Sequence, residues 1–391
     1  MINIKSIVSQ NFKNKNCLLR LDLNIPLSEK GEILDDTRII ESIPSIDFLL
    51  DQSAKVIIIS HIGRPLGKFN EKFSFIKLIK IIEEKIKRRI IFIRYEDQKN
   101  IKKIINNYPY GTLFMLDNLR FNPGEEQSNK DFINFLSSFS DIYINDGFGT
   151  IHRNHASITG ISKQIPSYGG ILVEKEITNI IECLNYNSDK SIAILGGSKI
   201  KDKIPIIENL SKSFKDIIIT GGMIRPFLIA SKKIIQKDES IYKEEIEFAK
   251  ILLKLNNKIY IPEHLICSKS IKSEAVFLHS TQITDEDNIY DIAPNSMNEI
   301  TKKVLNSDKI IWNGPPGIYE YEKFQNGTKI LIQSIINSDS KIKLAGGGST
   351  VAAINYFKAS DFFTHISTGG GAFLSLLEGK YMEGIEVLKN E

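Results

Sequence analysis

Short apolar runs rich in isoleucine, leucine and valine alternate along the chain with longer stretches of helical period. The apolar runs occupy positions 17–27, 55–65, 89–93, 112–121, 141–149, 191–199, 216–223, 258–264, 309–317, 342–349 and 363–371. Amphipathic stretches such as 202–214 and 242–255 lie between them. Near-continuous apolar strands separated by helices are typical of parallel sheets that are covered on both faces. The pattern therefore predicts an α/β fold.

The length of the chain indicates more than one domain. A chain of 391 residues is too long for one ordinary hydrophobic core and suits two domains. The stretch 169–190 has the pattern of a helix that joins them. We expect two Rossmann-like, doubly wound parallel-sheet domains, the first over 1–170 and the second over 190–376, with a hinge helix over 171–189 between them.

Composition narrows the class of protein. Hydrophobic residues make up 42% and charged residues 25% of the chain, as in globular, water-soluble proteins. The formal net charge of +4 is small for this length, so no nucleic-acid partner is expected. Cys17, Cys183 and Cys267 form neither a metal-ligand spacing nor a disulfide framework. Because the sequence has no signal-peptide pattern and no bilayer-length apolar run, we expect a cytoplasmic protein without a membrane partner.

Basic side chains mark the strand ends of the first half. In parallel sheets, ligands bind beyond the carboxyl ends of the strands. The basic residues at or just after these predicted ends and turns are Arg38, His61, Arg64, Arg120 and Arg153, and Asp22 and Asn24 follow the first strand. A single arginine here is more often part of a surface or interdomain ion pair. Several together predict a site for a small anion with phosphate and carboxylate groups, because guanidinium groups bind both in a bidentate manner.

The second half carries glycine clusters at the corresponding positions. They lie in 196–203, 221–223, 312–320, 346–350 and 367–373. Glycine lets phosphate oxygens approach backbone N–H groups, and a following helix adds its positive N-terminus. One such loop is weak evidence, because tight turns need glycine anyway, but five in one domain predict a site for a phosphate chain. Neither a P-loop motif nor a G-x-G-x-x-G motif is present.

The motifs taken together resemble those of the phosphoglycerate kinase family. They have the order and spacing of that family over essentially residues 1–391, and they read LLRLDLNIPL, DDTRI, SHIGRP, LDNLRFNPGEE, NDGFGTIHRNHAS, ILGGSKIKDKI, IIWNGPPGIYE and HISTGGGAFLSLLEGK. The resemblance implies two domains, a C-terminal tail of about 377–391 that returns to the first domain, and a monomer.

The resemblance also assigns site residues. It implies that 3-phosphoglycerate is bound by Asp22, Leu23, Asn24, Arg38, His61, Ile62, Gly63, Arg64, Arg120 and Arg153. It implies that ATP or ADP, with the Mg²⁺ that the nucleotide carries, is bound by Lys199, Lys203, Asn313, Glu320, Gly347, Gly348, Ser349 and Thr350. The catalytic set that it implies is Arg38, Lys199, Lys203, Gly370 and Gly371. No resident metal is expected.

The implied reaction is reversible phosphoryl transfer between 1,3-bisphosphoglycerate with ADP and 3-phosphoglycerate with ATP. It needs no covalent enzyme intermediate, because positioning and charge neutralisation provide most of the catalysis. Arg38 and Lys199 would neutralise the transferring group, helped by the amides of Gly370 and Gly371. Because the two ligand sets belong to different domains, hinge closure is expected, and it would also exclude water.

The sequence departs from the family pattern in its second half. Ser349 stands where the family has the aspartate that binds the nucleotide's Mg²⁺, and a neutral hydroxyl is a weaker partner for that ion. Further departures near the expected base pocket are Arg225, Pro226, His264 and Ala293. We therefore expect ordinary acid binding but weakened handling of MgATP, and Asp202 is a candidate replacement ligand.

Two alternatives remain open. The first is a family member that binds phosphoglycerate without turnover, and Ser349 is the reason to consider it. The second is a small-molecule binding protein with paired α/β domains, which the phosphate loops and the missing signal peptide argue against.

Overall fold

The computed structural model describes residues 3–197, 200–234, 242–255 and 258–390. The chain divides into two compact units, residues 1–178 with 381–391 and residues 179–380. Each unit has its own sheet and its own buried core.

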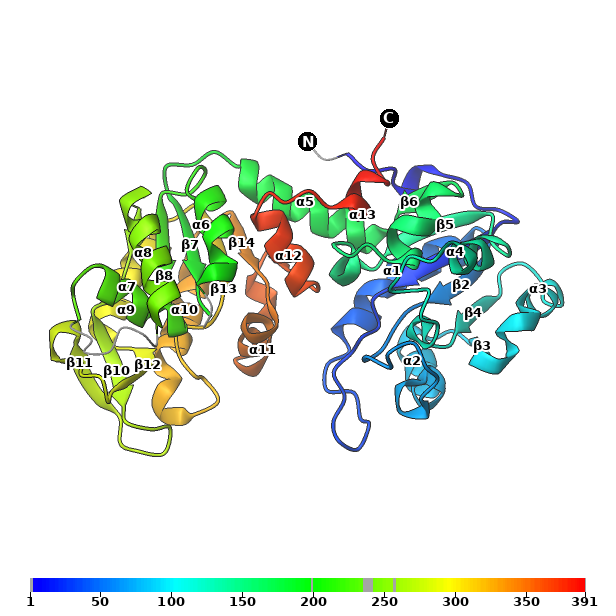
Figure 1. The fold of residues 1–391 in the computed structure, drawn as a ribbon. Coiled ribbons are helices and arrows are strands. Elements are labelled where there is room, and N and C mark those ends of the chain that lie inside the picture. Colours follow the sequence, from blue (N-terminus) through cyan, green and yellow to red (C-terminus); the bar gives the residue numbers. More distant parts are fainter. Residues whose placement is uncertain (1–2, 198–199, 235–241, 256–257, 391) are drawn as a thin grey trace. The chain divides into compact units, whose positions relative to one another are not determined.

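The first unit contains a six-stranded parallel sheet with the order β3-β4-β2-β1-β5-β6 (Figure 1). Its strands are β1 Asn16–Leu21, β2 Lys55–Ile59, β3 Ile91–Ile93, β4 Leu113–Leu116, β5 Ile142–Asp146 and β6 Ser167–Gly169. Its helices are α1 Thr37–Asp51, α2 Ile79–Ile86, α3 Ile101–Asn106, α4 Lys130–Ser137 and α13 Glu383–Glu386, and α5 Ile171–Asn185 begins in this unit. The strand order reverses between β1 and β5, and the carboxyl ends at such a switch point are where doubly wound sheets bind ligands.

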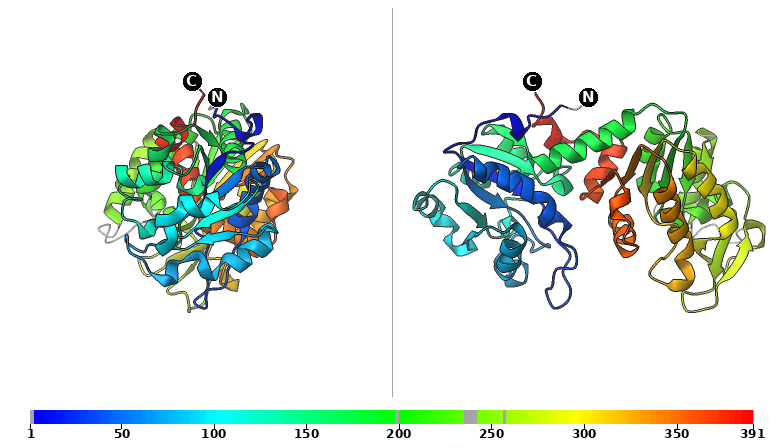
Figure 2. Two further views of the ribbon diagram at one scale, coloured as in Figure 1. Left: turned by 90° about the vertical axis from the view of Figure 1, so that its right-hand side faces the viewer. Right: turned by 180° about the vertical axis from the view of Figure 1, so that it is seen from behind.

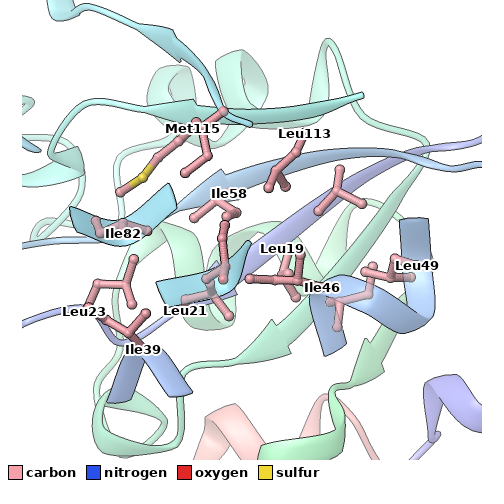
Figure 3. Packing of buried hydrophobic residues seen from close by; sticks show 14 of the residues in the cluster. Leu19, Leu21, Leu23, Ile39, Ile46, Leu49, Ile58, Ile82, Leu113 and Met115 are labelled. Atoms are coloured by element: carbon pink, nitrogen blue, oxygen red, sulfur yellow. The ribbon is translucent and has the colours of Figure 1, made fainter. Parts of the chain in front are cut away.

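Both faces of this sheet are buried because alternate residues of each strand point to opposite sides. On one face, Leu19 and Ile58 pack with Ile46 of α1 and Ile82 of α2 (Figure 3). On the other face, the second cluster joins strand residues such as Leu18 and Ile57 to residues of α3 and α4. This packing explains why the strands read as continuous apolar runs rather than as alternating ones.

The end of the chain belongs to the first unit. Ile4 pairs with Lys389 in an antiparallel bridge, so the first and last described segments lie side by side (Figure 2). The backbone N–H of Lys5 donates to the carbonyl of Leu388 at 2.7 Å. Gly384 of α13 lies so close to the carbonyl of Ile151 that a Cβ there would meet it at 2.2 Å. The tail is therefore held by backbone contacts as well as by side chains.

The second unit also contains a six-stranded parallel sheet, with the order β15-β14-β13-β7-β8-β9. Its strands are β7 Ser191–Leu195, β8 Asp216–Ile219, β9 Ile259–Tyr260, β13 Lys309–Asn313, β14 Ile342–Ala345 and β15 His365–Ile366. Its helices are α6 Ile204–Leu210, α7 Ile224–Ala230, α8 Lys243–Leu255, α9 Pro294–Leu305, α10 Asn326–Asn337, α11 Gly348–Tyr356 and α12 Gly370–Leu377. Here the order reverses between β13 and β7.

A small antiparallel sheet completes the second unit. Its order is β11-β10-β12, and its strands are β10 His264–Ser268, β11 Val276–His279 and β12 Asn288–Ile292. The sequence did not predict this sheet, because its strands are short and β11 and β12 carry exposed positions that break the apolar run. The predicted fold class, two doubly wound parallel-sheet domains, is confirmed. None of the helices in the described ranges is long and apolar enough to cross a membrane.

Candidate active site

An ion pair lies at the carboxyl end of β1, at the switch point of the first unit. Arg38, in the first turn of α1, places Nη1 2.9 Å from Oδ2 of Asp22. The same Nη1 donates to the backbone carbonyl of Asn24 at 2.8 Å. The Arg38 side chain remains 27% exposed, so it is anchored by its partners and still reachable by a ligand.

His61 lies beneath this pair in a buried, strongly positive environment. Its side chain is 2% exposed, and its Nδ1 lies 3.2 Å from Nη2 of Arg20. Burial lowers the pKa of His61 well below its usual value, and the charges of Arg20, Arg120, Arg153 and Arg38 lower it further. His61 is therefore neutral at physiological pH. Because Arg20 can only donate, Nδ1 of His61 accepts and its proton sits on Nε2.

The loop after β2 is held from several sides. Asn24 accepts from the backbone N–H of Gly63 through Oδ1 at 2.9 Å, and Arg120 donates to the Gly63 carbonyl at 2.9 Å. Asn118 donates to the carbonyl of Ile62 at 2.7 Å. Gly63 has a φ of +63°, and a Cβ there would lie 2.3 Å from the Phe73 ring, so only glycine fits. The loop is thus positioned by the residues predicted to bind the acid.

The structure brings most of the predicted acid-binding residues together. The charges of Arg38, Arg120 and Arg153 all lower the pKa of His61. Arg64 is exposed on the loop after β2 and is not among the residues that lower this pKa. Leu23 is buried, and its backbone N–H donates to Oγ of Ser60 at 2.9 Å. This hydrogen bond helps to hold the turn after β1 in place.

Two buried residues of this site were missed by sequence reasoning. Arg20 is 1% exposed as the fifth of the six residues of β1, where its Nε donates to Oγ of Ser157 at 3.0 Å. Glu125 is buried and accepts from both the N–H and the Oγ of Ser157. Although burial raises the pKa of Glu125, hydrogen bonds and the charge of Arg20 hold it below its usual value. An arginine inside an otherwise apolar strand was the available signal.

At the strand ends of the second unit, a buried lysine is linked by hydrogen bonds to an asparagine and to the glycine-containing loops. Lys203 is largely buried, and its Nζ donates to Oδ1 of Asn313. Asn313 in turn donates to the carbonyl of Gly346 at 2.7 Å. Burial lowers the pKa of Lys203 to about 8, so it keeps its charge at neutral pH but loses it more readily than an exposed lysine. This chain of contacts ties the turn before α6 to the ends of β13 and β14.

The glycines at these strand ends pack against one another. A Cβ on Gly347, whose φ is +99°, would lie 2.3 Å from Nδ2 of Asn313. A Cβ on Gly370 would lie 3.3 Å from the Cα of Gly347. Gly348 begins α11 and Gly370 begins α12, so two helix N-termini lie close together. Backbone N–H groups and helix dipoles make this a favourable place for phosphate oxygens.

The two hydroxyls of this region have different roles. Thr350 is buried, and its Oγ1 accepts from the backbone N–H of Gly314 at 2.7 Å, so it supports the glycine loops. Ser349 is exposed at the start of α11.

Other residues predicted to bind the nucleotide or to act in catalysis are exposed. They include Gly371 and Glu320, and Glu320 hydrogen-bonds with Tyr319. Lys199 lies outside the described residues.

A hollow opens beside the glycine loops of the second unit. It is lined by Gly197, Gly221, Gly222, Arg225, Tyr242, Asn288, Ile289, Tyr290, Pro315, Pro316, Gly317, Ile318 and Ser349. Among the four departures near the expected base pocket, Arg225 lies on this wall. Ala293 packs instead with Ile266 and Phe324 in a small cluster. Within the described ranges, no group of three or more histidine, cysteine, aspartate or glutamate side chains is placed to hold a metal ion.

This combination defines a class of protein. One α/β unit brings cationic side chains together at a place suited to a small anion. The other unit has helix N-termini with glycines, which suit a phosphate chain. Two such sites in one protein are typical of a phosphotransferase.

Comparisons with known proteins agree. A family model described as phosphoglycerate kinase matches residues 7–380. Phosphoglycerate kinase from Dictyoglomus turgidum is 36% identical over 400 residues, covering 99% of each chain. That from Borrelia hermsii is 36% identical over 394 residues, covering 99% of this chain and all of that one (100%). The structure of phosphoglycerate kinase from Coxiella burnetii matches with a TM-score of 0.85 at 30% identity over 98% of each chain. That from Pyrococcus horikoshii matches with a TM-score of 0.85 at 26% identity over 98% of each chain.

The chain belongs to the phosphoglycerate kinase family, as its sequence motifs predicted. It is a kinase that transfers a phosphoryl group to a carboxyl group, and its small-molecule substrates are 3-phosphoglycerate and ATP.

Proposed function

We propose that the two units divide the reaction between them. Residues 1–170 with the tail from about 377 bind the acid, residues 190–376 bind the nucleotide, and 171–189 form the hinge helix. The observation that carries this proposal is the Asp22–Arg38 pair beside the buried His61, because the further charges of Arg20, Arg120 and Arg153 around His61 make a preformed cationic site at a switch point. The glycine loops around Asn313 support the assignment of the other unit.

On the acid side, we assign binding to Asp22, Leu23, Asn24, Arg38, His61, Ile62, Gly63, Arg64, Arg120 and Arg153. The arginines would bind the phosphate and the carboxylate of 3-phosphoglycerate. His61, neutral and protonated on Nε2, would donate one further hydrogen bond. The anchored Arg38 would stay close to the carboxylate that receives the phosphoryl group.

On the nucleotide side, we assign binding to Lys199, Lys203, Asn313, Glu320, Gly347, Gly348, Ser349 and Thr350. Lys203 would neutralise nucleotide phosphate, whose negative charge favours the protonated lysine. Thr350 would act through the loop that it supports. The exposed Ser349 hydroxyl would be a weak ligand for the Mg²⁺ of MgATP, which takes most of its neutralisation from the phosphates and water.

In the transfer itself, a carboxylate oxygen of 3-phosphoglycerate attacks the γ-phosphorus while the bond from that phosphorus to the ADP oxygen breaks. Arg38, Lys199 and Lys203 would neutralise the equatorial oxygens, and the N–H groups of Gly370 and Gly371 would donate to them. Because these groups belong to different units, we propose that the hinge closes during each turnover, which would also exclude water. We further propose a cytoplasmic monomer without nucleic-acid or membrane partners.

The test is a coupled assay with 3-phosphoglycerate and MgATP at several free Mg²⁺ concentrations. The wild type should turn over, and Arg38→Ala should lose about 100- to 1000-fold in kcat, equivalent to about 3–4 kcal/mol. Arg88→Ala is a suitable control, because Arg88 pairs with Asp47 near the amino end of β3, away from the switch point. Near-normal turnover of Arg38→Ala would refute its role. Binding of phosphoglycerate without wild-type turnover would indicate the non-catalytic alternative.

A further inference from the structure

A buried carboxylate lies behind the wall of the hollow in the second unit. Asp291, the fourth residue of β12, has no solvent exposure (0%). Its Oδ1 accepts from the backbone N–H of Ile292 at 2.8 Å, and its Oδ2 accepts from that of Gly327 at 2.7 Å. Gly327 lies in the first turn of α10, so the carboxylate joins the small antiparallel sheet to the start of a helix.

Two glycines leave room for this carboxylate. A Cβ on Gly317 would lie 2.3 Å from Oδ1 of Asp291, and one on Gly327 would lie 2.2 Å from the same atom. Neither glycine adopts a positive φ, so space rather than backbone conformation requires glycine at both positions. Three segments of the chain therefore meet on one side chain: β12, the turn after β13, and the first turn of α10.

Two of these segments form the wall of the hollow. Asn288, Ile289 and Tyr290 of β12 line it on one side, and Pro315 to Ile318 line it on the other. The backbone N–H of Ile318 donates to the carbonyl of Tyr290 at 3.1 Å, so the two sides are directly joined. Gly317 donates to Oγ1 of Thr328 in α10 at 3.3 Å. Asp291 holds this junction from the side away from the hollow.

Burying a carboxylate costs more free energy than burying an apolar side chain of similar size. Burial raises the pKa of Asp291 to about 7, and two backbone hydrogen bonds oppose that shift only in part. An apolar side chain would avoid the cost of taking a carboxylate out of water. The benefit lies in geometry, because a carboxylate can fix two backbone N–H groups at defined positions.

We propose that Asp291 is a positioning residue for the nucleotide: it sets the spacing between β12 and the 315–318 turn, and so determines the affinity for ATP and ADP without touching either. The proposal rests on the assignment of the nucleotide to this unit, and it adds a residue that does not line the hollow. Glu320, one of the residues assigned above to the nucleotide, follows the same turn by two residues.

The test compares three variants in the assay described above. In Asp291→Asn one carboxylate oxygen becomes an amide NH₂, which cannot accept from Gly327 or Ile292. KM for MgATP should rise about tenfold, the equivalent of one lost hydrogen bond. KM for 3-phosphoglycerate and kcat at saturating MgATP should stay within about twofold of the wild type. Gly327 does not line the hollow, and a Cβ there would lie 2.2 Å from Oδ1 of Asp291, so Gly327→Ala should raise the same KM.

The matched control is Asp146→Asn. Asp146 is an equally buried carboxylate at the end of β5 in the first unit, where its Oδ1 accepts from the backbone N–H of Val173 at 3.1 Å. It should leave KM for MgATP unchanged. Direct calorimetric titration of each folded variant with ADP provides a readout that does not depend on turnover.

The outcomes separate this proposal from the one before it. If the wild type binds neither ATP nor ADP, the assignment of the nucleotide to this unit fails. If the wild type binds ADP but Asp291→Asn and Gly327→Ala bind it within twofold of the wild type, the positioning role is wrong. A loss confined to kcat, or an equal rise in both KM values, would show a general structural role and would also overturn it.

Discussion

Nη2 of Arg20 lies 3.2 Å from Nδ1 of His61, in the buried part of the first unit. Arg20 also donates to the carbonyl of Leu21 and to Oγ of Ser157, so its planar guanidinium spans three acceptors. His61 is thereby fixed as a neutral ring with its N–H on Nε2. Among the surrounding arginines, His61 therefore provides a hydrogen-bond donor without adding another positive charge.

The first prediction concerns Arg20. Lysine keeps the charge but cannot span three acceptors, so Arg20→Lys should release the His61 ring. We expect KM for 3-phosphoglycerate to rise about tenfold while KM for MgATP stays unchanged, measured by initial rates. Arg88→Lys is the control at an exposed, paired arginine. Unchanged binding of the acid by Arg20→Lys would show that His61 is held by its other neighbours.

The second prediction concerns the protonation of His61. Its pKa is lowered in the folded protein, so below the ordinary pKa the unfolded chain binds more protons than the folded one. His61 should therefore reduce stability as the pH falls through about 6.5, and it should add no pH dependence above that value. A ¹⁵N NMR titration, with His61→Gln for assignment, should show a neutral ring protonated on Nε2 throughout pH 6–8. A midpoint inside that range would contradict the burial argument.

The third prediction concerns Ser349. Because its hydroxyl is exposed at the first turn of α11, a carboxylate in its place can reach solvent without burial. Ser349→Asp should lower KM for MgATP by roughly tenfold, or raise kcat, most strongly at low free Mg²⁺. Ser349→Ala is the matched control and should differ little from the wild type. If the aspartate changes neither constant, the hydroxyl is not a limitation of this enzyme.

The fourth prediction concerns Arg225. It lines the hollow, and its Nη2 donates to the carbonyl of Asp287 and, at 3.3 Å, to that of Thr284. These carbonyls lie in the turn that leads into β12. Arg225→Ala should loosen this turn and raise KM for MgATP about tenfold, and Arg225→Lys should recover part of the loss. Equal KM values for the three proteins would show that the turn is stable without the guanidinium.

The fifth prediction concerns pH and the stability of the first unit. Burial raises the pKa of Asp146 from 3.8 to about 6. Between these values the folded protein binds more protons than the unfolded chain, so this group's contribution to stability falls as the pH rises, by up to about 1.4 kcal/mol per pH unit. Asp146→Asn removes that slope.

Urea denaturation between pH 4 and pH 7 measures this slope. Relative to the wild type, Asp146→Asn should gain stability up to about pH 6 and then stay level. Parallel pH dependences of the two proteins would contradict the prediction.

Much of the architecture was determined by the sequence alone. Apolar runs such as 55–65 and 309–317 predict strands buried on both faces, because only a covered parallel sheet needs so many consecutive apolar residues. Asp22 lies at the carboxyl edge of the first sheet and Asn313 at the carboxyl edge of the second, as the apolar runs 17–27 and 309–317 predict for parallel strands. The family motifs then indicated the reaction, because each motif is a short segment that can be recognised in the sequence without knowledge of the fold.

Tertiary structure decided what depends on partners distant in the chain. Arg20 is a site residue because Ser157 and His61 surround it, and no local pattern places them there. Asp291 supports the hollow because two glycines, 26 and 36 positions further on, leave space for its carboxylate. Thr350, which motif similarity assigns to the nucleotide, also accepts a hydrogen bond from the backbone N–H of Gly314, a partner that no local pattern indicates. Periodicity reports which face of an element is buried, whereas the neighbour of a buried polar group is set by packing between elements.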